Sequence, residues 1–479
     1  MTGVHIVGGG LAGCEAAWQV ARRGVPCVIH EMRPVRSTAV HQTGGLAELV
    51  CSNSFRGDKL DNAVGLIKEE MRRLGSLVMQ CAEATRVPAG AALAVDRRRF
   101  SDAVTAALEA HPLVSIVREE VTDIPSSDGP VVVATGPLTS DALSRAIASM
   151  VGAEHLSFYD AISPIVLAES LDASKVFRAS RWGRSLRGAA PESTAATGEA
   201  GCRTATSEAG CRNATADEDG DYLNCPLDRS EYERFYDALV HAESATVHDF
   251  DAVQFFEGCL PIEVMAHRGR DTLRFGPMKP VGLRDPRTGR VPYAVVQLRQ
   301  DTLAGDHFSL VGFQTQITWG DQAKVLRLIP GLERAEFVRF GMVHRNTYIN
   351  GPTVLRPTWQ TRLRPHLLFA GQVSGVEGYV ESAASGLLAG INAAKLALGE
   401  VPLVAPRTTA IGALAHYVSH ADPRTYQPTN VTFGIIEPIE GVHKSQRKAA
   451  TAERALRVLA TWGRESGLDL ADASDGSRP

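Results

Sequence analysis

Hydrophobic positions in the first third of the chain alternate between two periods, which predicts strands followed by helices. Short apolar or β-branched runs predict buried strands, and apolar residues at helical spacing predict amphipathic helices. The predicted strands cover 3–7, 27–31, 114–117 and 131–134, and the predicted helices cover 11–23, 62–79 and a segment capped by Asp96. Such an alternation predicts a doubly wound α/β domain.

The pattern changes near residue 155 and returns later. Residues 251–320 read as β-rich with many Gly and Pro turns. After about 330 a buried strand at 367–370 is followed by helices at 379–398 and 445–462. We therefore expect an α/β domain in two parts, interrupted by a smaller α+β insertion domain. The predicted boundaries are 1–155, 156–330 and 331–479.

One segment of the insertion, 188–221, is low in complexity. It is rich in Ala, Gly, Ser, Thr and acids, and it nearly duplicates Glu199-Ala-Gly-Cys-Arg203 as Glu208-Ala-Gly-Cys-Arg212. Such a composition cannot bury enough apolar surface to fold, so we expect a disordered surface loop.

Composition and charge limit the class of protein. The 479 residues carry a net charge of −4, with no apolar run long enough to cross a bilayer and no signal-peptide pattern, which favours a cytoplasmic protein. The eight cysteines show no zinc spacing, so no metal is predicted and free thiols are expected.

Charge is unevenly distributed along the chain. The segment 188–221 holds a local charge of −5, whereas 266–299 has eight Lys/Arg and two acids. Residues 337–366 have five arginines and no acid. The basic stretches suit a phosphate backbone or a solvated surface.

A dinucleotide fingerprint stands between the first strand and the first helix. In Gly8-x-Gly10-x-x-Gly13 the glycines let the backbone approach a pyrophosphate at the helix N-terminus. Glu31 ends the next strand, where its carboxylate would accept a hydrogen bond from a ribose hydroxyl. A structural glycine turn is the alternative. The predicted cofactor-binding residues are Gly8, Gly9, Gly10, Leu11, Ala12, Gly13, Glu31, Gly136, Gly371, Gln372, Gly378 and Tyr379.

Two later strand ends favour FAD over NAD. The strand ending at Gly136 and the strand ending at Gly371 both run into glycine turns of the kind that two-part Rossmann flavoproteins use for the ribityl and isoalloxazine end. The helix after the second turn has small residues on one side, which we expect to allow close packing against the sheet: Ala383, Gly386, Gly390 and Ala394.

Several longer blocks complete a recognisable set. They are Val7-Gly-Gly-Gly-Leu-Ala-Gly-Cys-Glu-Ala-Ala17, Leu49-Val-Cys-Ser-Asn-Ser54, Tyr222-Leu-Asn-Cys-Pro226, Leu273-Arg-Phe-Gly-Pro-Met-Lys-Pro-Val-Gly282, Gln297-Leu-Arg-Gln-Asp301, His344-Arg-Asn-Thr347 and Gly375-Val-Glu-Gly-Tyr-Val-Glu-Ser382. With these motifs the chain closely resembles the bacterial folate- and FAD-dependent tRNA uracil-54 C5-methyltransferases. The resemblance covers nearly everything except 188–221 and the tail after about 465. It departs from the usual short loop between Arg181 and Tyr222.

The resemblance implies an FADH2-oxidising methylenetetrahydrofolate–tRNA (uracil-5-)-methyltransferase with a Rossmann-type FAD-binding domain. Its cofactors would be FAD, 5,10-methylenetetrahydrofolate and NADPH or NADH. It also implies two catalytic thiols, Cys51 and Cys225. One of them is needed as a nucleophile, because C5 of uracil becomes nucleophilic only after a thiolate adds to C6. We expect Cys225 to be this nucleophile and Cys51 to be the cysteine on the flavin side, shielding the flavin or acting as a base. The reverse assignment and two inert thiols are the alternatives.

We expect four basic side chains to contact RNA phosphates: Arg268, Arg270, Arg274 and Lys279. The alternative is that each forms an ion pair on the protein surface. The other functions that fit are the same chemistry on a ribosomal RNA uracil, a flavin-dependent NAD(P)H oxidoreductase for a small molecule, and a non-catalytic RNA-binding flavoprotein.

Overall fold

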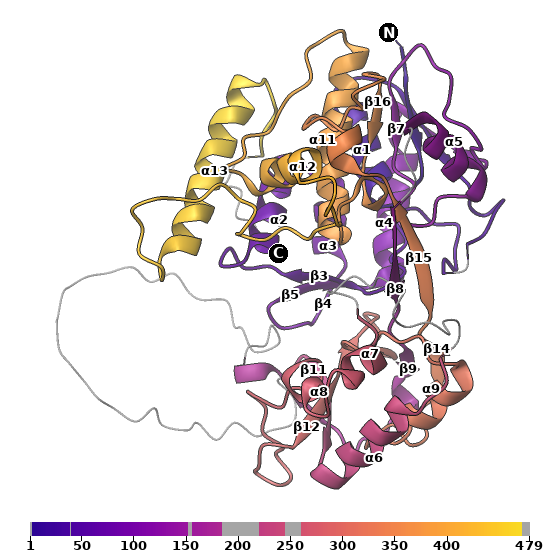
Figure 1. Ribbon diagram of the computed structural model, residues 1–479, viewed down its shortest axis with the longest axis vertical. Helices are drawn as coiled ribbons and strands as arrows, with labels where there is room; N and C mark the ends of the chain where they lie inside the picture. Colours follow the sequence, from indigo (N-terminus) through magenta and orange to yellow (C-terminus); the bar gives the residue numbers. More distant parts are fainter. Residues whose placement is uncertain (1, 39, 152–155, 184–219, 245–259, 472–479) are drawn as a thin grey trace.

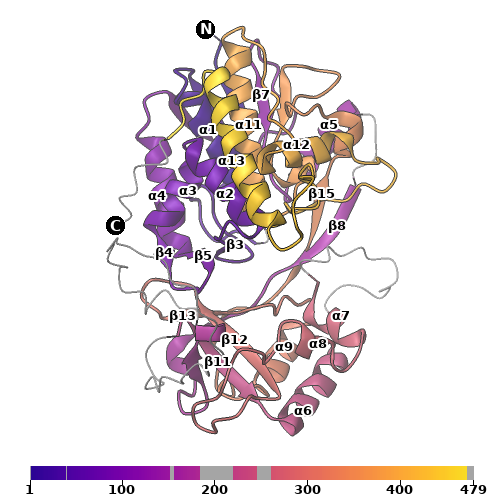
Figure 2. The same cartoon turned by 90° about the vertical axis from the view of Figure 1, so that its left-hand side faces the viewer.

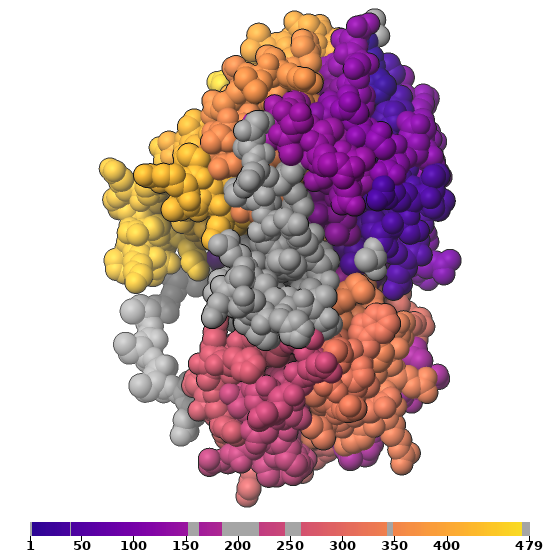
Figure 3. Space-filling view, turned by 45° about the vertical axis from the view of Figure 1, so that its right-hand side comes forward, coloured from indigo at the N-terminus to yellow at the C-terminus, as the bar shows by residue number. Residues whose placement is uncertain are grey.

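The computed structural model describes residues 2–38, 40–151, 156–183, 220–244 and 260–471. They form two units, an α/β unit at the top of Figure 1 and a smaller α+β unit below it. The view in Figure 2 shows the same division, and Figure 3 shows it on the surface. An antiparallel pair, β8 (Leu156–Ala161) and β15 (Val343–Tyr348), runs between the units.

The upper unit is built on a parallel five-stranded sheet with the order β16-β7-β1-β2-β6. These strands are β1 (Val4–Val7), β2 (Cys27–Glu31), β6 (Val114–Arg118), β7 (Val131–Val133) and β16 (Leu367–Phe369). The register pairs Val7 with His30 and Val133, so the ends of β1, β2 and β7 meet at one edge. The last strand of the described residues, β16, thus completes a sheet begun by β1, which confirms the interrupted Rossmann-type arrangement.

Two helices, α1 (Leu11–Ala21) and α11 (Tyr379–Ala397), lie side by side in the upper unit. A Cβ added at Gly386 would lie 2.2 Å from the carbonyl oxygen of Ala12, and one at Gly390 would lie 2.5 Å from that of Ala16. The small residues therefore admit the backbone of α1. We expected these residues to pack against the sheet. At Gly386 and Gly390 this is wrong, because the closest neighbour is the backbone of helix α1.

The helix predicted over 62–79 is two helices, α2 (Ala63–Arg73) and α3 (Leu77–Ala84). Gly75 has a φ of +72°, which ends the first helix, and the Ser76 side chain accepts the Met79 amide and begins the second. A three-stranded sheet lies nearby, with β3 (Ser54–Gly57), β4 (Arg86–Val87) and β5 (Ala92–Val95). Asp96 caps α4 (Arg97–Glu109) by accepting the Arg99 amide, as predicted.

The lower unit has a six-stranded sheet with the order β10-β11-β12-β13-β9-β14. Its strands are β9 (Ile165–Leu167), β10 (Phe177–Ala179), β11 (Tyr222–Leu227), β12 (Ala294–Gln300), β13 (His307–Leu310) and β14 (Phe337–Arg339). Its helices are α6 (Arg229–Val240), α7 (Ile262–His267), α8 (Thr272–Phe275) and α9 (Trp319–Leu326). Leu332 and Ala335 belong to the core of this unit. The boundary predicted at 330 therefore falls inside the lower unit, because β14 still pairs with β9.

The remaining α-helices of the described residues contribute to the core of the upper unit: α5 (Asp141–Val151), α10 (Gly351–Val354), α12 (Ala410–His420) and α13 (Arg447–Glu465). No helix of the described ranges is long and apolar enough to cross a membrane. The predicted loop 188–221 lies outside the described residues except for its last two positions.

Candidate functional site

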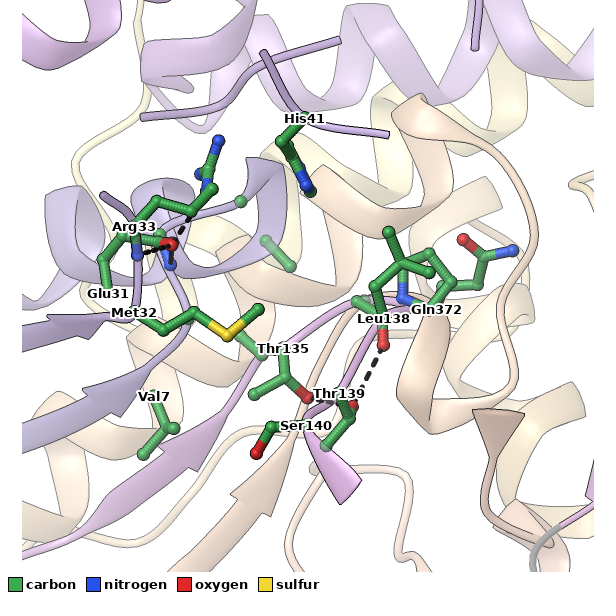
Figure 4. Close-up of a pocket in the computed structure, with 18 of the residues that line it drawn as sticks. Val7, Glu31, Met32, Arg33, His41, Thr135, Leu138, Thr139, Ser140 and Gln372 are labelled. Atoms are coloured by element: carbon green, nitrogen blue, oxygen red, sulfur yellow. Dashed lines mark hydrogen bonds and ion pairs between the residues drawn. The ribbon is translucent and has the colours of Figure 1, made fainter. Parts of the chain in front are cut away.

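A pocket opens where β1, β2 and β7 end and α11 begins, and it encloses about 1010 Å³ including space open to solvent. Figure 4 shows Glu31 and Arg33 on one side of it, Thr135, Thr139 and Ser140 below, and Gln372 opposite. Ten of the twelve predicted cofactor residues line this pocket: Gly8, Gly9, Gly10, Leu11, Ala12, Glu31, Gly136, Gly371, Gln372 and Tyr379.

The two other predicted residues shape the backbone beside it. A Cβ at Gly13 would lie 1.9 Å from the carbonyl oxygen of Gly8, so only glycine permits the tight turn into α1. Gly378 has a φ of +103° and precedes α11. A Cβ at Gly10, by contrast, meets no protein atom within 4 Å. The backbone at Gly10 thus leaves room for another molecule at the N-terminus of α1, where amide groups favour a pyrophosphate.

Glu31 is held in place by hydrogen bonds from the protein itself. Its Oε2 accepts the Gly9 amide at 2.8 Å, and its Oε1 accepts the amide and the Nε of Arg33 at 2.9 and 2.8 Å. Burial pushes the pKa of Glu31 upward, but the hydrogen bonds and charge of Arg33 outweigh it, and the pKa lies below its ordinary value. An ionised carboxylate has lone pairs left for ribose hydroxyls, so the site fits the ribose and pyrophosphate of FAD.

Cys51 lies at the junction of this pocket and the lower unit. The hydroxyl oxygen of Tyr379, which lines the pocket, accepts the amide of Cys51 at 2.7 Å and that of Ser52 at 3.1 Å. The Cys51 side chain is half-buried. One tyrosine therefore fixes the backbone of the predicted catalytic cysteine relative to the cofactor pocket.

Three arginines enclose the same loop from both units. Arg97, at the start of α4, donates to the carbonyl oxygens of Leu49 and Cys51. Arg339, at the end of β14, also donates to the Cys51 carbonyl. Arg299 of β12 donates to Ser52 and Asn53, both at 2.7 Å. This cluster is absent from the sequence-based prediction, because its members are 40 to 242 residues apart and share no motif.

Cys225 has a different environment. Its side chain is fully buried in the core of the lower unit, and burial raises the pKa of its thiol well above the ordinary value. On β11 the Tyr222 side chain faces the upper unit, where its hydroxyl donates to the Ala89 carbonyl. Because side chains alternate along a strand, Cys225 points to the opposite face. In this structure the sheet thus stands between its thiol and the upper unit.

The other described cysteines pack in the core of the upper unit. Cys14, Cys27 and Cys81 are buried there, and burial raises the pKa of each thiol. Cys14 also approaches the Gly9 carbonyl at 3.3 Å. Cys202, Cys211 and Cys259 lie outside the described residues.

The four predicted RNA contacts lie on or next to α7 and α8 of the lower unit. Arg270 pairs with Asp237 at 2.7 Å and lies over the Tyr236 ring. Arg274 pairs with Asp271 at 2.7 Å and lies 3.6 Å from the Tyr293 ring centroid. Arg268 is exposed and Lys279 half-buried. Arg270 and Arg274 therefore already form ion pairs within the protein. A phosphate that bound either arginine would share it with the aspartate.

Sequence reasoning missed several residues that line the pocket. Arg33, His41, Glu48, Thr135 and Thr139 belong to this group. Arg33 follows Glu31 by two positions, and that spacing was a usable signal. The others come from loops whose course depends on tertiary contacts.

Comparison with known proteins gives a consistent assignment. The family described as "Glucose inhibited division protein A" matches residues 3–193 and 204–401. A methylenetetrahydrofolate--tRNA-(uracil-5-)-methyltransferase TrmFO of Desulforudis audaxviator is 55% identical over 97% of this chain and 99% of its own, and one of Geobacter sulfurreducens is 56% identical over 96% and 99%.

Among solved structures, Aquifex aeolicus GidA aligns with TM-scores of 0.64 and 0.65 in two crystal forms. At 18% identity it covers 96% and 98% of this chain and 74% and 76% of the GidA chain, which supports the fold. With its FAD-type pocket and these near full-length relatives, the chain belongs to the methylenetetrahydrofolate--tRNA-(uracil-5-)-methyltransferase TrmFO family.

Proposed function

We propose that this protein methylates C5 of a uracil in tRNA, at position 54 of the T-loop, with methylenetetrahydrofolate as carbon donor. The observation that carries the proposal is the Tyr379 bridge between an FAD-type pocket and Cys51, in a chain that matches TrmFO relatives over nearly its whole length. Bound FAD, reduced by NADPH or NADH, supplies the carbon transfer and the hydride that complete the methyl group.

The residues of the chain have separate tasks in this proposal. The glycine turn at Gly8–Gly13 and the anchored Glu31 hold the pyrophosphate and ribose, and Gln372 and Tyr379 line the far end. Tyr379 orients the Cys51 loop at the pocket edge. Cys51 then serves as the base at C5, and Cys225 adds to C6 of the uracil.

The burial of Cys225 makes its role the most demanding part of the proposal. Its thiol faces the core of the lower unit, so addition to C6 requires that RNA binding opens the packing around β11. Cys51 needs no such change, because it is half-buried at the pocket edge. The two assignments therefore differ in a way that an experiment can separate.

The first test is product formation. The purified holoenzyme is incubated with unmodified tRNA transcript, NADPH and methylenetetrahydrofolate, and nuclease digests are analysed for 5-methyluridine by mass spectrometry. We expect product at the T-loop uracil. Product with ribosomal RNA alone would change the substrate and keep the chemistry. No product with either RNA, together with NADPH oxidation coupled to a small molecule, would support the oxidoreductase instead.

The second test identifies the nucleophile. RNA with 5-fluorouridine at the target position traps the thiol adduct, because the C5 fluorine cannot leave as a proton does. We expect the adduct with wild type and with Cys51→Ala, and none with Cys225→Ala. An adduct that persists in Cys225→Ala and disappears in Cys51→Ala would reverse the two roles. Cys27→Ala is the matched control, because its thiol is buried in the other unit.

A further inference from the structure

The loop of Cys51 carries an excess of positive charge among its hydrogen-bond partners. Arg97, Arg299 and Arg339 all donate to residues 49–53. Among the described residues, Asp301 is the carboxylate that offsets them, with an oxygen 2.9 Å from the Arg97 Nε. All three arginines are half-buried. Charges that are partly withdrawn from water gain from a partner of opposite sign, so three guanidiniums beside one carboxylate favour a further anion.

The arginines are held by both units. Burial lowers the pKa of Arg299, and burial followed by the charge of Arg97 lowers the pKa of Arg339 to about 10. The Arg339 Nε has no hydrogen-bond partner among the residues that the structure describes. The cluster is therefore under strain from its own charge, and a negative group beside it would be stabilised.

The Cys51 thiol is an ionisable group of the right sign in this loop, and the Cys51 carbonyl oxygen accepts hydrogen bonds from Arg97 and Arg339 at 3.3 and 3.4 Å. A negative charge on Cys51 raises the pKa of Arg97, Arg299 and Arg339, as it does that of the Tyr379 hydroxyl. The charged and titratable groups around the cluster include these four residues, Asp301, and Tyr222 of β11, whose hydroxyl is the first charge partner of Arg299. Thiolates form where cations surround a cysteine.

We propose that Arg97, Arg299 and Arg339 hold Cys51 as a thiolate, the form that its role as the base at C5 requires. This inference rests on the proposed function for its base role alone. In the step, the C5–H bond breaks, the proton joins the Cys51 sulfur, and the bond electrons move into the C4 carbonyl as an enolate. The three arginines are positioning residues, since they act through Cys51.

The experiment measures the Cys51 thiol directly, without RNA or folate. The FAD-loaded enzyme is alkylated with iodoacetamide across pH, and the Cys51 peptide is quantified by mass spectrometry. We expect half-maximal alkylation at least about one pH unit below the roughly 8.5 of a free cysteine. Arg339→Gln should move this midpoint up by about one unit, and Arg339→Lys, which keeps the charge, should restore it.

Arg98→Gln is the matched control. Arg98 adjoins Arg97 but its side chain is 90% exposed, so its removal should leave the midpoint unchanged. The flavin spectrum of each variant verifies that the site is intact. A wild-type midpoint near 8.5, or one that Arg339→Gln does not move, would overturn the proposal.

A second readout ties the thiolate to catalysis. The rate of 5-methyluridine formation should rise with pH through the same midpoint, and Arg339→Gln should shift this rise by the same amount. A low alkylation midpoint without any methylated product would overturn the proposed function and keep the thiolate. Methylation by an enzyme whose Cys51 alkylation midpoint is near 8.5 would support the proposed function and overturn the thiolate.

Discussion

At the scale of single residues, the cofactor turn separates two uses of glycine. Gly13 is required by the protein itself, because its Cβ would overlap the Gly8 carbonyl, whereas Gly10 faces open space within the pocket. Gly13→Ala should therefore destabilise the apoprotein by about 1–3 kcal/mol. Gly10→Ala should leave the apoprotein unchanged and weaken FAD binding at least tenfold, about 1.4 kcal/mol.

Thermal unfolding of both apoproteins and flavin fluorescence titration check this pair. If Gly10→Ala lowered the unfolding temperature of the apoprotein as much as Gly13→Ala does, the protein itself would require glycine at position 10. The prediction that this space is reserved for the cofactor would then be wrong. The turn itself was predictable from sequence, because the fingerprint, its strand and its helix are all local. The face of Cys225 was not, since it depends on which side of β11 meets the upper unit.

At the scale of elements, α2 is fastened to α12 through one buried carboxyl group. Glu70 accepts the Ala410 and Ile411 amides, both at 2.8 Å, at the first turn of α12. Glu70→Gln replaces one acceptor with a donor and should destabilise the protein by about 1–3 kcal/mol. Glu69→Gln removes only partly exposed ion pairs with Arg72 and Arg73 and should cost about 0–1 kcal/mol.

The Glu70 prediction has a pH dependence with a definite sign. Burial, opposed by the two amides, raises the pKa of Glu70 to about 7 from 4.5. Between these values the folded protein holds a proton that the unfolded chain releases, so this group's contribution to stability falls as pH rises. Urea unfolding should show a larger difference between wild type and Glu70→Gln at pH 5 than at pH 7.5. An equal difference would contradict it.

Elements also show where sequence reasoning fails. The strands at 27–31 and 114–117 and the cap at Asp96 were predicted well, because local apolar runs and capping residues determine them. The helix over 62–79 was predicted as one piece because its apolar spacing continues through Gly75, where the backbone turns. The arginine cluster at Cys51 was out of reach, since only the meeting of two units assembles it.

At the scale of the whole molecule, the two units have separate cores that meet through polar contacts. The upper core holds every strand that lines the pocket, and the lower core surrounds Phe235, Phe308 and Phe313. Between them, the Asn53 side chain donates to the Gln300 carbonyl and the Gly90 amide donates to Asp221. Polar interfaces of this kind join units without merging their cores.

Removal of FAD should therefore act on one unit. Ligand at about a hundred times its dissociation constant stabilises the state that binds it by about 2.7 kcal/mol, which for a unit of this size corresponds to roughly 5–10 °C. Scanning calorimetry of holo and apo protein should show two transitions, of which only that of the upper unit shifts. Leu298→Ala, in the lower core, should lower the other transition and cost about 2–5 kcal/mol.

The two perturbations together decide how the units are coupled. If FAD removal and Leu298→Ala each moved only one transition, the Cys51 loop would lie between two bodies able to shift relative to each other. RNA binding could then change the packing around Cys225 without unfolding the flavin site. If both perturbations moved a single shared transition, the contacts at Asn53 and Asp221 would make one cooperative body. A buried Cys225 could then reach uracil only through local opening of β11, and its adduct would form more slowly than the flavin is reduced.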